Sequence, residues 1–200
     1  MSSVVMVDAG GANLGSVRWA LRRLGVEPSL TVDVDAIRAA ERVILPGVST
    51  AATVMRRLRE LELVDVLRGL RQPLLGVCVG MQLLFDHSEE DDTPCLGLLP
   101  GKVAKLPVQP GIRVPHMGWN LLRATRDDGL LANVSDDAYA YFVHSYAAPV
   151  TEDCIASTEH GHSFAAIVRR GNVMGAQFHP ERSAATGATV LRNFLSMEAA

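Results

Sequence analysis

Apolar residues in the first half of the chain alternate between short continuous runs and helical spacing. The runs at residues 4–7, 43–45 and 74–77 have the length of buried strands, and residues 29–34 alternate weakly as a further strand. Pro46-Gly47 is expected to end the second of these runs. The apolar positions between them that recur on one helical face are Val17, Ala20, Leu21 and Leu24; Ala51, Val54, Met55 and Leu58; and Leu63, Val66, Leu67 and Leu70. Strands that alternate with helices predict an α/β fold whose mostly parallel sheet is flanked by helices.

The second half of the chain predicts an additional antiparallel strand region. Residues 88–92 are acidic and are expected to form a solvated loop, and four prolines between residues 100 and 115 exclude helix there. The expected strands lie at residues 139–146, 154–158, 164–169 and 172–178. Gly171-Asn172 is a candidate tight turn, and Ser183 can cap a final helix. No repeat or boundary divides the chain, so residues 1–200 are expected to form a single domain.

Composition and charge narrow the possible functions. The chain has 200 residues, of which 48% are hydrophobic, enough to bury a large core. A net charge of −3 without a basic cluster argues against nucleic-acid binding. The three cysteines stand at unrelated spacings, which suggest neither disulfides nor a zinc site. Neither a metal nor a cofactor is expected. A reducing cytoplasm fits this cysteine content best. No apolar stretch reaches the roughly 18 residues of a membrane span, so no membrane association is expected.

The candidate chemistry begins at residues 74–85. An apolar strand, a glycine, a lone cysteine, a second glycine and an apolar helical pattern follow one another there. This order predicts a sharp strand-to-helix turn with Cys78 at its apex, which is the geometry of a nucleophile elbow. The N–H groups and dipole of a helix N-terminus favour a reactive thiolate. The alternative is that Cys78 is a small buried apolar residue, and this segment alone leaves both interpretations open.

A second candidate group lies at the end of the last predicted strand, where His179 is followed by Pro180 and Glu181. Proline disfavours the α region for the residue before it, so the segment is expected to be extended, with the side chains of His179 and Glu181 on the same side. A base is thereby delivered together with a carboxylate that can orient it. Cysteine, histidine and carboxylate at strand ends form a triad in its cysteine form, which favours the catalytic interpretation of Cys78.

At these two segments the chain resembles the class I, triad-type glutamine amidotransferases, whose elbow reads G-x-C-x-G-x-Q and whose last strand leads into H-P-E. Residues 8–17, 45–48, 114–120 and 141–146 make it similar, more narrowly, to the glutaminase subunits of imidazole glycerol phosphate synthases. The resemblance implies a class I glutamine amidotransferase-like fold. It also implies hydrolysis of L-glutamine to glutamate and ammonia, which passes to a cyclase subunit for imidazole glycerol phosphate formation in histidine biosynthesis.

The resemblance assigns roles to individual residues. Cys78 attacks the glutamine carboxamide, His179 transfers protons, and Glu181 orients His179. The implied donors to the oxyanion lie at Gly47, Val48 and Val79. The residues implied to bind the substrate are Gln82, Ser145 and Tyr146. For Gln82 the alternative is an ordinary exposed helix residue.

The resemblance further implies low activity in the isolated chain and a rise when the cyclase and its nucleotide ligand bind. Gly47 is a candidate hinge, because glycine reaches positive φ at little steric cost and could turn a peptide N–H into the oxyanion hole. One oriented donor is worth roughly 3 kcal/mol, a factor of about a hundred in rate.

The implied partner is a cyclase subunit with a (β/α)₈ barrel, which would form a heterodimer with this chain. The implied docking residues are Asn13, Pro115, His116, Met117, Trp119 and Tyr139. Trp119 has a physical argument of its own, because tryptophan is a favoured interface anchor; its alternative is a core aromatic at the edge of the sheet. His144 is expected to be structural, and His160 and His162 to mark a turn.

The chain departs from the family pattern at three places. Ala9 stands where an aromatic residue is common, Ser49-Thr50 where glycine and alanine are usual, and Val79 where leucine is common. The first departure could alter packing against the partner, and the second the flexibility of the oxyanion loop.

Two rival interpretations remain open from the sequence. A glutaminase that serves anthranilate or guanylate synthesis would share the triad but is not expected to carry residues 114–120. A non-enzymatic regulatory or scaffolding partner would retain the fold alone, and the intact triad argues against it.

Overall fold

The computed structural model describes residues 3–10, 14–47 and 49–198. In chain order its first half contains β1 (Val4–Val7), α1 (Leu14–Arg23), β2 (Ser29–Thr31), α2 (Val34–Ala39), β3 (Arg42–Gly47), α3 (Ala51–Glu60), α4 (Val64–Arg68), β4 (Leu74–Cys78), α5 (Val79–Gln82), β5 (Phe85–Ser88), η1 (Glu90–Asp92), β6 (Thr93–Pro94) and β7 (Leu99–Lys105). Its second half contains β8 (His116–Leu121), β9 (Arg123–Ala124), η2 (Gly129–Leu131), β10 (Tyr139–His144), β11 (Tyr146–Ala147), β12 (Cys154–Glu159), β13 (Ser163–Arg170), β14 (Val173–Ala176), η3 (Pro180–Arg182) and α6 (Ala184–Leu195).

An eight-stranded sheet in the order β2-β1-β3-β4-β14-β13-β12-β9 organises the fold. Its first five strands are parallel, and β13, β12 and β9 continue it in antiparallel fashion. Strands β8 and β10 pair separately, and β11-β7-β5-β6 form a third sheet. The predicted α/β fold, with a mostly parallel sheet and an additional antiparallel region, is therefore confirmed.

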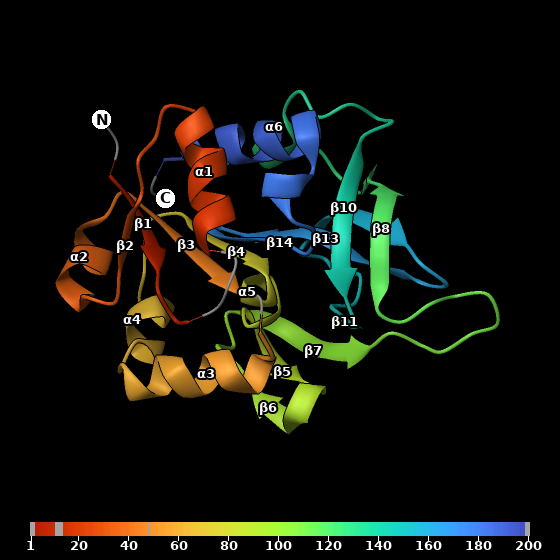
Figure 1. The fold of residues 1–200 in the computed structure, drawn as a ribbon, viewed down its shortest axis with the longest axis horizontal. Helices are drawn as coiled ribbons and strands as arrows, with labels where there is room; N and C mark the ends of the chain where they lie inside the picture. The colour runs from red at the N-terminus through yellow and green to blue at the C-terminus, as the bar shows by residue number, and fades with distance from the viewer. Residues whose placement is uncertain (1–2, 11–13, 48, 199–200) are drawn as a thin grey trace.

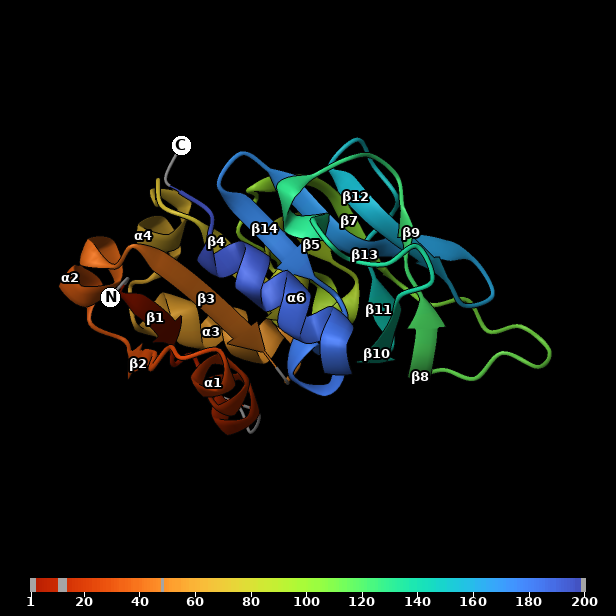
Figure 2. The same cartoon turned by 90° about the horizontal axis from the view of Figure 1, so that it is seen from above.

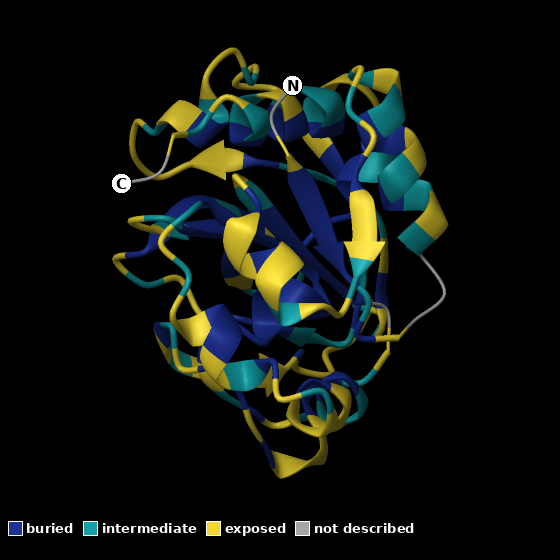
Figure 3. Cartoon of the chain, turned by 90° about the vertical axis from the view of Figure 1, so that its left-hand side faces the viewer, coloured by how far each residue is buried: buried dark blue, intermediate teal, exposed yellow. Residues whose placement is uncertain are grey.

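Helices cover both faces of the large sheet. Helices α1 and α6 lie on one face and α3 and α4 on the other (Figures 1 and 2). Figure 3 shows buried strands behind helices whose outer faces are exposed. The predicted helical faces are buried, as at Leu21 of α1, Leu58 of α3 and Phe194 of α6. Each such side chain contributes roughly 1.5–3 kcal/mol on burial.

Several element boundaries differ from the sequence-based expectation. The strand expected at residues 29–34 ends at Thr31, because Asp33 caps α2 by accepting the N–H of Ala36 at 2.7 Å. Strand β3 is not ended by Pro46-Gly47, since these residues still pair with the last residues of β4. The helix after Cys78 is only one turn long, because Phe85 pairs with β7 as part of β5.

Two polar residues have different roles from those expected. Glu90, expected in a solvated loop, is half-buried, and its Oε2 accepts the N–H of Ala51 at 2.7 Å at the start of α3. Burial raises the pKa of Glu90, although this hydrogen bond opposes the shift. Ser183 makes no side-chain cap for α6. Its hydroxyl instead donates to the carbonyl of His179 at 2.7 Å and accepts the N–H of Tyr141 at 2.9 Å.

No helix among the residues that the structure describes is long and apolar enough to cross a membrane.

Candidate active site

The turn at Cys78 has the strained backbone that an elbow requires. Cys78 has φ 55° and ψ −113°, a conformation that side-chain-bearing residues rarely adopt. The glycines on either side let the turn pack against the sheet. A Cβ at Gly76 would lie 2.5 Å from the carbonyl oxygen of Gly80, and one at Gly80 would lie 1.8 Å from that of Leu45. The G-x-C-x-G spacing is therefore a steric requirement of this turn.

His179 and Glu181 meet at the neighbouring strand end. His179 is extended, with φ −94° and ψ 98°, but residues 180–182 form one turn of 3₁₀ helix. The expected extended segment is therefore wrong beyond His179. The turn nevertheless places Oε1 of Glu181 2.9 Å from Nδ1 of His179, and both side chains are buried. Strand β14 lies beside β4, which brings His179 next to the Cys78 turn.

The charge state of His179 is set by competing effects. Burial opposes the imidazolium, but hydrogen bonds to Cys78 and Glu181, together with their negative charges, raise the pKa of His179 to about 10. At neutral pH the imidazole is therefore protonated between a sulfur atom and a carboxylate. A protonated imidazole in this position can give a proton to a leaving amine.

Glu181→Gln is expected to destabilise the folded chain most at mildly acidic and neutral pH. A histidine whose folded pKa is raised contributes stability that is fully present below its ordinary pKa of 6.5 and is lost as the pH rises through about 10. The difference in unfolding free energy between wild type and Glu181→Gln should therefore become smaller as the pH rises from 6.5 to about 10. Urea unfolding at a series of pH values measures this difference.

The control for this comparison is Glu60→Gln, which removes an exposed carboxylate paired with Arg56 and Arg57. Such surface pairs are worth about 0–1 kcal/mol, so this variant should lie close to wild type. A difference for Glu181→Gln that stays constant over the interval would show that this carboxylate does not stabilise the imidazolium.

A pocket of about 530 Å³ opens over the Cys78 turn. It is lined by Ser16, Ser49, Cys78, Val79, Gln82, Glu90, Val143, His144, Ser145, Tyr146, His179 and Arg182. The structure thus brings the proposed nucleophile and base together with the three candidate substrate-binding residues. Sequence analysis did not assign six of these residues to the site: Ser16, Ser49, Glu90, Val143, His144 and Arg182. Arg182 directly follows the H-P-E segment, but only tertiary packing brings Ser16 and Glu90 to this site.

Gln82 is not the exposed helix residue of the alternative interpretation. Its side chain is only 2% exposed, and its Nε2 donates to the carbonyl of Tyr146 at 2.7 Å. Val79 follows Cys78 as the first residue of α5. Its backbone N–H therefore lies directly after the sulfur-bearing residue.

Gly47 packs closely against the elbow. It is not among the glycines with positive φ in this structure of the chain without its partner, and its role as a hinge during activation stays a prediction. A Cβ at Gly47 would lie 2.9 Å from both the backbone nitrogen of Gly80 and Cβ of Val79. Glycine thus allows β3 to approach the elbow closely. The predicted oxyanion residue Val48 lies outside the described residues.

The candidate docking residues lie mainly on the β8–β10 pair, at the side of the molecule away from β1 and β2 (Figure 1). Pro115 is exposed, and Met117, Trp119 and Tyr139 are 63%, 50% and 51% exposed. Trp119 is therefore not a core aromatic, and its ring packs edge-on against Tyr141 at 5.8 Å.

Among the described docking candidates, His116 does not expose its side chain on this surface. His116 is buried, with its ring stacked on His160 at 4.0 Å, so its expected role as a surface docking residue is wrong. Ala9 is also buried, so this departure from the family pattern does not reach the surface. Asn13 lies outside the described residues.

The remaining histidines form no metal site in the part of the chain that the structure describes. His160 and His162 flank Gly161, which has φ 74°, in the turn between β12 and β13, as expected. His144 is buried, and burial lowers its pKa to about 3. The three cysteines are free and buried.

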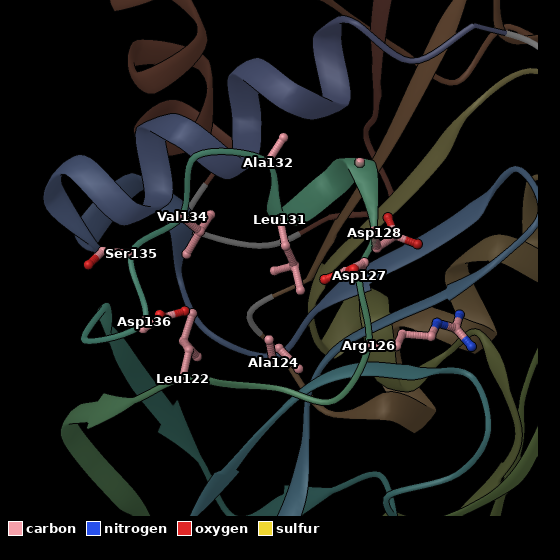
Figure 4. Close-up of a pocket in the computed structure, with 12 residues that line it drawn as sticks. Leu122, Ala124, Arg126, Asp127, Asp128, Leu131, Ala132, Val134, Ser135 and Asp136 are labelled. Carbon is pink, nitrogen blue, oxygen red and sulfur yellow. The ribbon is translucent and has the colours of Figure 1, made fainter.

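A second hollow of about 560 Å³ lies beside β9 and η2 (Figure 4). Leu131 points into it, and Asp127 and Asp136 lie at its edge. Its polar neighbours Arg126 and Asp128 already bond to protein groups, the guanidinium to the carbonyls of Glu152 and Arg169. No histidine or cysteine lines this hollow, so the pocket over Cys78 is the candidate active site.

Comparisons with known proteins agree with this geometry. Residues 5–197 match the family described as Glutamine amidotransferase class-I. The chain is 60% identical over 200 residues to the imidazole glycerol phosphate synthase subunit HisH of Xylella fastidiosa (strain Temecula1 / ATCC 700964), with 100% of both chains covered. It is 59% identical over 197 residues to the subunit of the same name from Xanthomonas axonopodis pv. citri (strain 306), with 98% of both covered.

Solved structures share the fold at lower identity. A crystal structure of a glutamine amidotransferase matches with a TM-score of 0.75 and 22% identity over 97% of both chains. The structure of PurLQS from Thermotoga maritima matches with a TM-score of 0.70 and 21% identity over 98% of both chains.

Proposed function

The chain belongs to the class-I glutamine amidotransferases and, among them, to the HisH subunits of imidazole glycerol phosphate synthase, and from this premise we propose that Cys78, His179 and Glu181 carry out its chemistry. The enzyme hydrolyses glutamine and supplies the ammonia to the cyclase reaction that forms imidazole glycerol phosphate in histidine biosynthesis. The observation that carries the residue assignment is His179, which is hydrogen-bonded to both Cys78 and Glu181 beside the pocket.

In the first half-reaction the Cys78 thiolate attacks the carboxamide carbon of glutamine. The carbonyl electron pair moves to oxygen, which gives a tetrahedral oxyanion. When this intermediate collapses, the C–N bond breaks and the imidazolium of His179 gives its proton to the departing nitrogen. Ammonia leaves, and a γ-glutamyl thioester remains on Cys78.

In the second half-reaction the neutral imidazole of His179 takes a proton from water, which attacks the thioester carbon. The C–S bond then breaks, glutamate leaves, and the Cys78 thiolate and His179 imidazolium are restored. Glu181 holds Nδ1 of the ring throughout and stabilises its positive charge.

Other pocket residues hold the substrate and its developing charge. The backbone N–H of Val79 and one from the Gly47-Val48 segment are the proposed oxyanion donors, each worth roughly 3 kcal/mol. Gln82, Ser145 and Tyr146 are the proposed contacts for the amino-acid end of glutamine, since they line the same pocket as Cys78. We treat residues 1–200 as one functional domain, because a single buried core includes side chains from β1 to α6.

The partner surface is the exposed part of the β8–β10 pair. Met117, Trp119 and Tyr139 expose large side chains there, and exposed aromatic residues are favoured at interfaces. We assign this surface, with Pro115, to contact with the cyclase subunit, a (β/α)₈ barrel. The high identity to HisH subunits disfavours an anthranilate or guanylate glutaminase.

Mixing the chain with a cyclase subunit tests this assignment. We expect slow glutamine hydrolysis by the chain alone and a rise of about a hundredfold when the cyclase and its nucleotide substrate are present, the effect of one correctly placed oxyanion donor. Trp119→Ala should weaken this stimulation, whereas Trp19→Ala, which removes an exposed tryptophan on α1, should not. A lone chain at full activity, or full stimulation of Trp119→Ala at limiting cyclase, would contradict the proposal.

A further inference from the structure

A chain of buried hydrogen bonds begins at the first residue of β8. Nδ1 of His116 lies 3.1 Å from Nε2 of His144, the last residue of β10. Nδ1 of His144 lies 2.9 Å from the carbonyl oxygen of Tyr146. The side chains of His116 and His144 are 3% and 6% exposed. Strand β8 is thus connected through two imidazoles to the carbonyl of Tyr146, a residue that lines the active-site pocket.

The carbonyl of Tyr146 also connects these hydrogen bonds to the proposed nucleophile. Nε2 of Gln82 donates to the carbonyl of Tyr146 at 2.7 Å and to Oε1 of Gln177 at 3.0 Å. Nε2 of Gln177 lies 4.0 Å from Sγ of Cys78. Gln82 and Gln177 are 2% and 0% exposed, so the contacts from Tyr146 to the sulfur are shielded from bulk water.

The chemistry of these groups fixes the direction of each bond at the histidine end. A carbonyl oxygen only accepts, so the proton of His144 must be on Nδ1. A neutral imidazole protonated there has an accepting Nε2, so Nδ1 of His116 must donate to it. Burial lowers the pKa of His144 to about 3 and that of His116 to about 4, so both rings are neutral at neutral pH, as this arrangement requires.

The amide end is fixed in the same way. Both N–H groups of Gln82 are used, one by the Tyr146 carbonyl and one by Gln177, so its own oxygen is left as an acceptor beside the substrate pocket. Because Gln177 turns its oxygen to Gln82, its N–H groups are directed to the side of Cys78. A reversed amide at either position would place two acceptors or two donors against each other.

We propose that Gln177 is a positioning residue that donates an N–H to the thiolate of Cys78, and that His116 and His144 hold its orientation through Tyr146 and Gln82. The inference rests on the proposed role of Cys78 as nucleophile. A hydrogen bond to a charged group is stronger than one between neutral groups, and a buried network stabilises a single arrangement only when every member is bonded. The residue at position 177 therefore affects the sulfur directly, whereas His144 affects it through the Tyr146 carbonyl and Gln82.

The test at position 177 separates the two bonds that its amide makes. Gln177→Glu keeps an oxygen for Gln82 but replaces the N–H that faces Cys78 with a second oxygen, whereas Gln177→Met removes both. In the complex with the cyclase subunit, we expect Gln177→Glu to lower kcat about tenfold or more with KM for glutamine within about threefold, and Gln177→Met to affect both. Alkylation of Cys78 by iodoacetamide, followed site-specifically by mass spectrometry, should be slower at neutral pH in both variants and recover as the pH rises.

The matched control is Met174→Leu, a volume-conserving change at a buried position of β14, the strand that Gln177 directly follows. It should leave kcat, KM and alkylation unchanged. A purely structural role for Gln177 would lower stability without changing the pH profile of alkylation, and that result would overturn the inference.

Two changes at His144 test the other end. His144→Phe keeps an aromatic ring against Phe164, whose centroid is 4.9 Å away, but cannot donate to Tyr146. His144→Asn loses the ring but places an amide N–H near the former Nδ1. We expect a raised KM and slower alkylation of Cys78 in His144→Phe, with partial recovery of both in His144→Asn even where its stability is lower. If His144→Phe has the KM and the alkylation rate of wild type, the proposed role of His116 and His144 in this hydrogen-bond network is wrong.

The failure of this inference can be distinguished from failure of the proposed function. If Cys78→Ala still hydrolyses glutamine, the nucleophile assignment is wrong and the inference fails with it. If Cys78→Ala is inactive but Gln177→Glu has the kcat and alkylation profile of wild type, only the positioning role is wrong.

Discussion

We expect Cys78→Ala to abolish glutamine-dependent synthesis by the complex and to leave ammonia-dependent synthesis intact. The variant removes the sulfur that forms the proposed thioester, while the cyclase chemistry lies on the other subunit. Loss of a triad nucleophile lowers kcat by about 10⁴-fold or more, because the covalent intermediate can no longer form. The remaining groups supply only a small residual rate. The measurement is the rate of imidazole glycerol phosphate formation with glutamine and, separately, with an ammonium salt.

Ammonia-dependent turnover is the internal control, because it requires a folded complex but no glutaminase chemistry. Glu181→Gln should reduce glutamine-dependent turnover less than Cys78→Ala does, because Glu181 acts only through the orientation and charge of His179. Loss of both activities in Cys78→Ala would point to a folding or docking defect. Retention of glutamine hydrolysis would assign the nucleophile elsewhere, whereas a γ-glutamyl thioester trapped on Cys78 of the wild type would exclude a non-enzymatic role.

Gly80→Ala is expected to cause the largest loss of stability among single-methyl additions near the elbow. The added Cβ would lie 1.8 Å from the carbonyl oxygen of Leu45, which belongs to the central strand β3. Neither backbone can move without disturbing the paired strands, so the cost should reach about 3 kcal/mol or more. For a chain of this size that corresponds to a fall in Tm of roughly 6–12 °C.

The matched control is Gly15→Ala, an exposed position in α1 where an added Cβ meets nothing within 4 Å. Alanine is favoured over glycine inside a helix by roughly 0.5–1 kcal/mol, so this variant should be neutral or slightly more stable. Thermal unfolding of both variants, with glutamine hydrolysis measured below their transitions, checks the prediction. Equal stability of Gly80→Ala and wild type would mean that the elbow can move away from β3.

Local sequence patterns predicted most of the elements correctly because burial on one face is a local property. Helical spacing placed α1, α3 and α6, and short apolar runs placed β1, β3 and β4. The pattern was misleading at residues 29–34, where a single capping carboxylate at Asp33 outweighed a weak alternation.

The elbow could also be anticipated from sequence. Two glycines around one cysteine, at the junction of a strand and a helix, leave few backbone solutions, and the structure adopts a positive φ at Cys78 with both glycines in close contact. The proximity of His179 and Glu181 likewise follows from their separation of two residues, although a 3₁₀ turn rather than an extended segment brings it about.

Only the tertiary structure decided which distant residues share the pocket and which face solvent. Glu90 comes from an acidic run that looks solvated, and His116 comes from a segment expected at the surface, yet the first lines the pocket and the second is buried. Gln177 gave no sequence signal beyond its place in a strand, but strand pairing sets it beside Cys78, 99 positions earlier in the chain. Periodicity reports which side of an element is buried; it contains no information on which element covers that side, because that choice depends on packing between segments far apart in sequence.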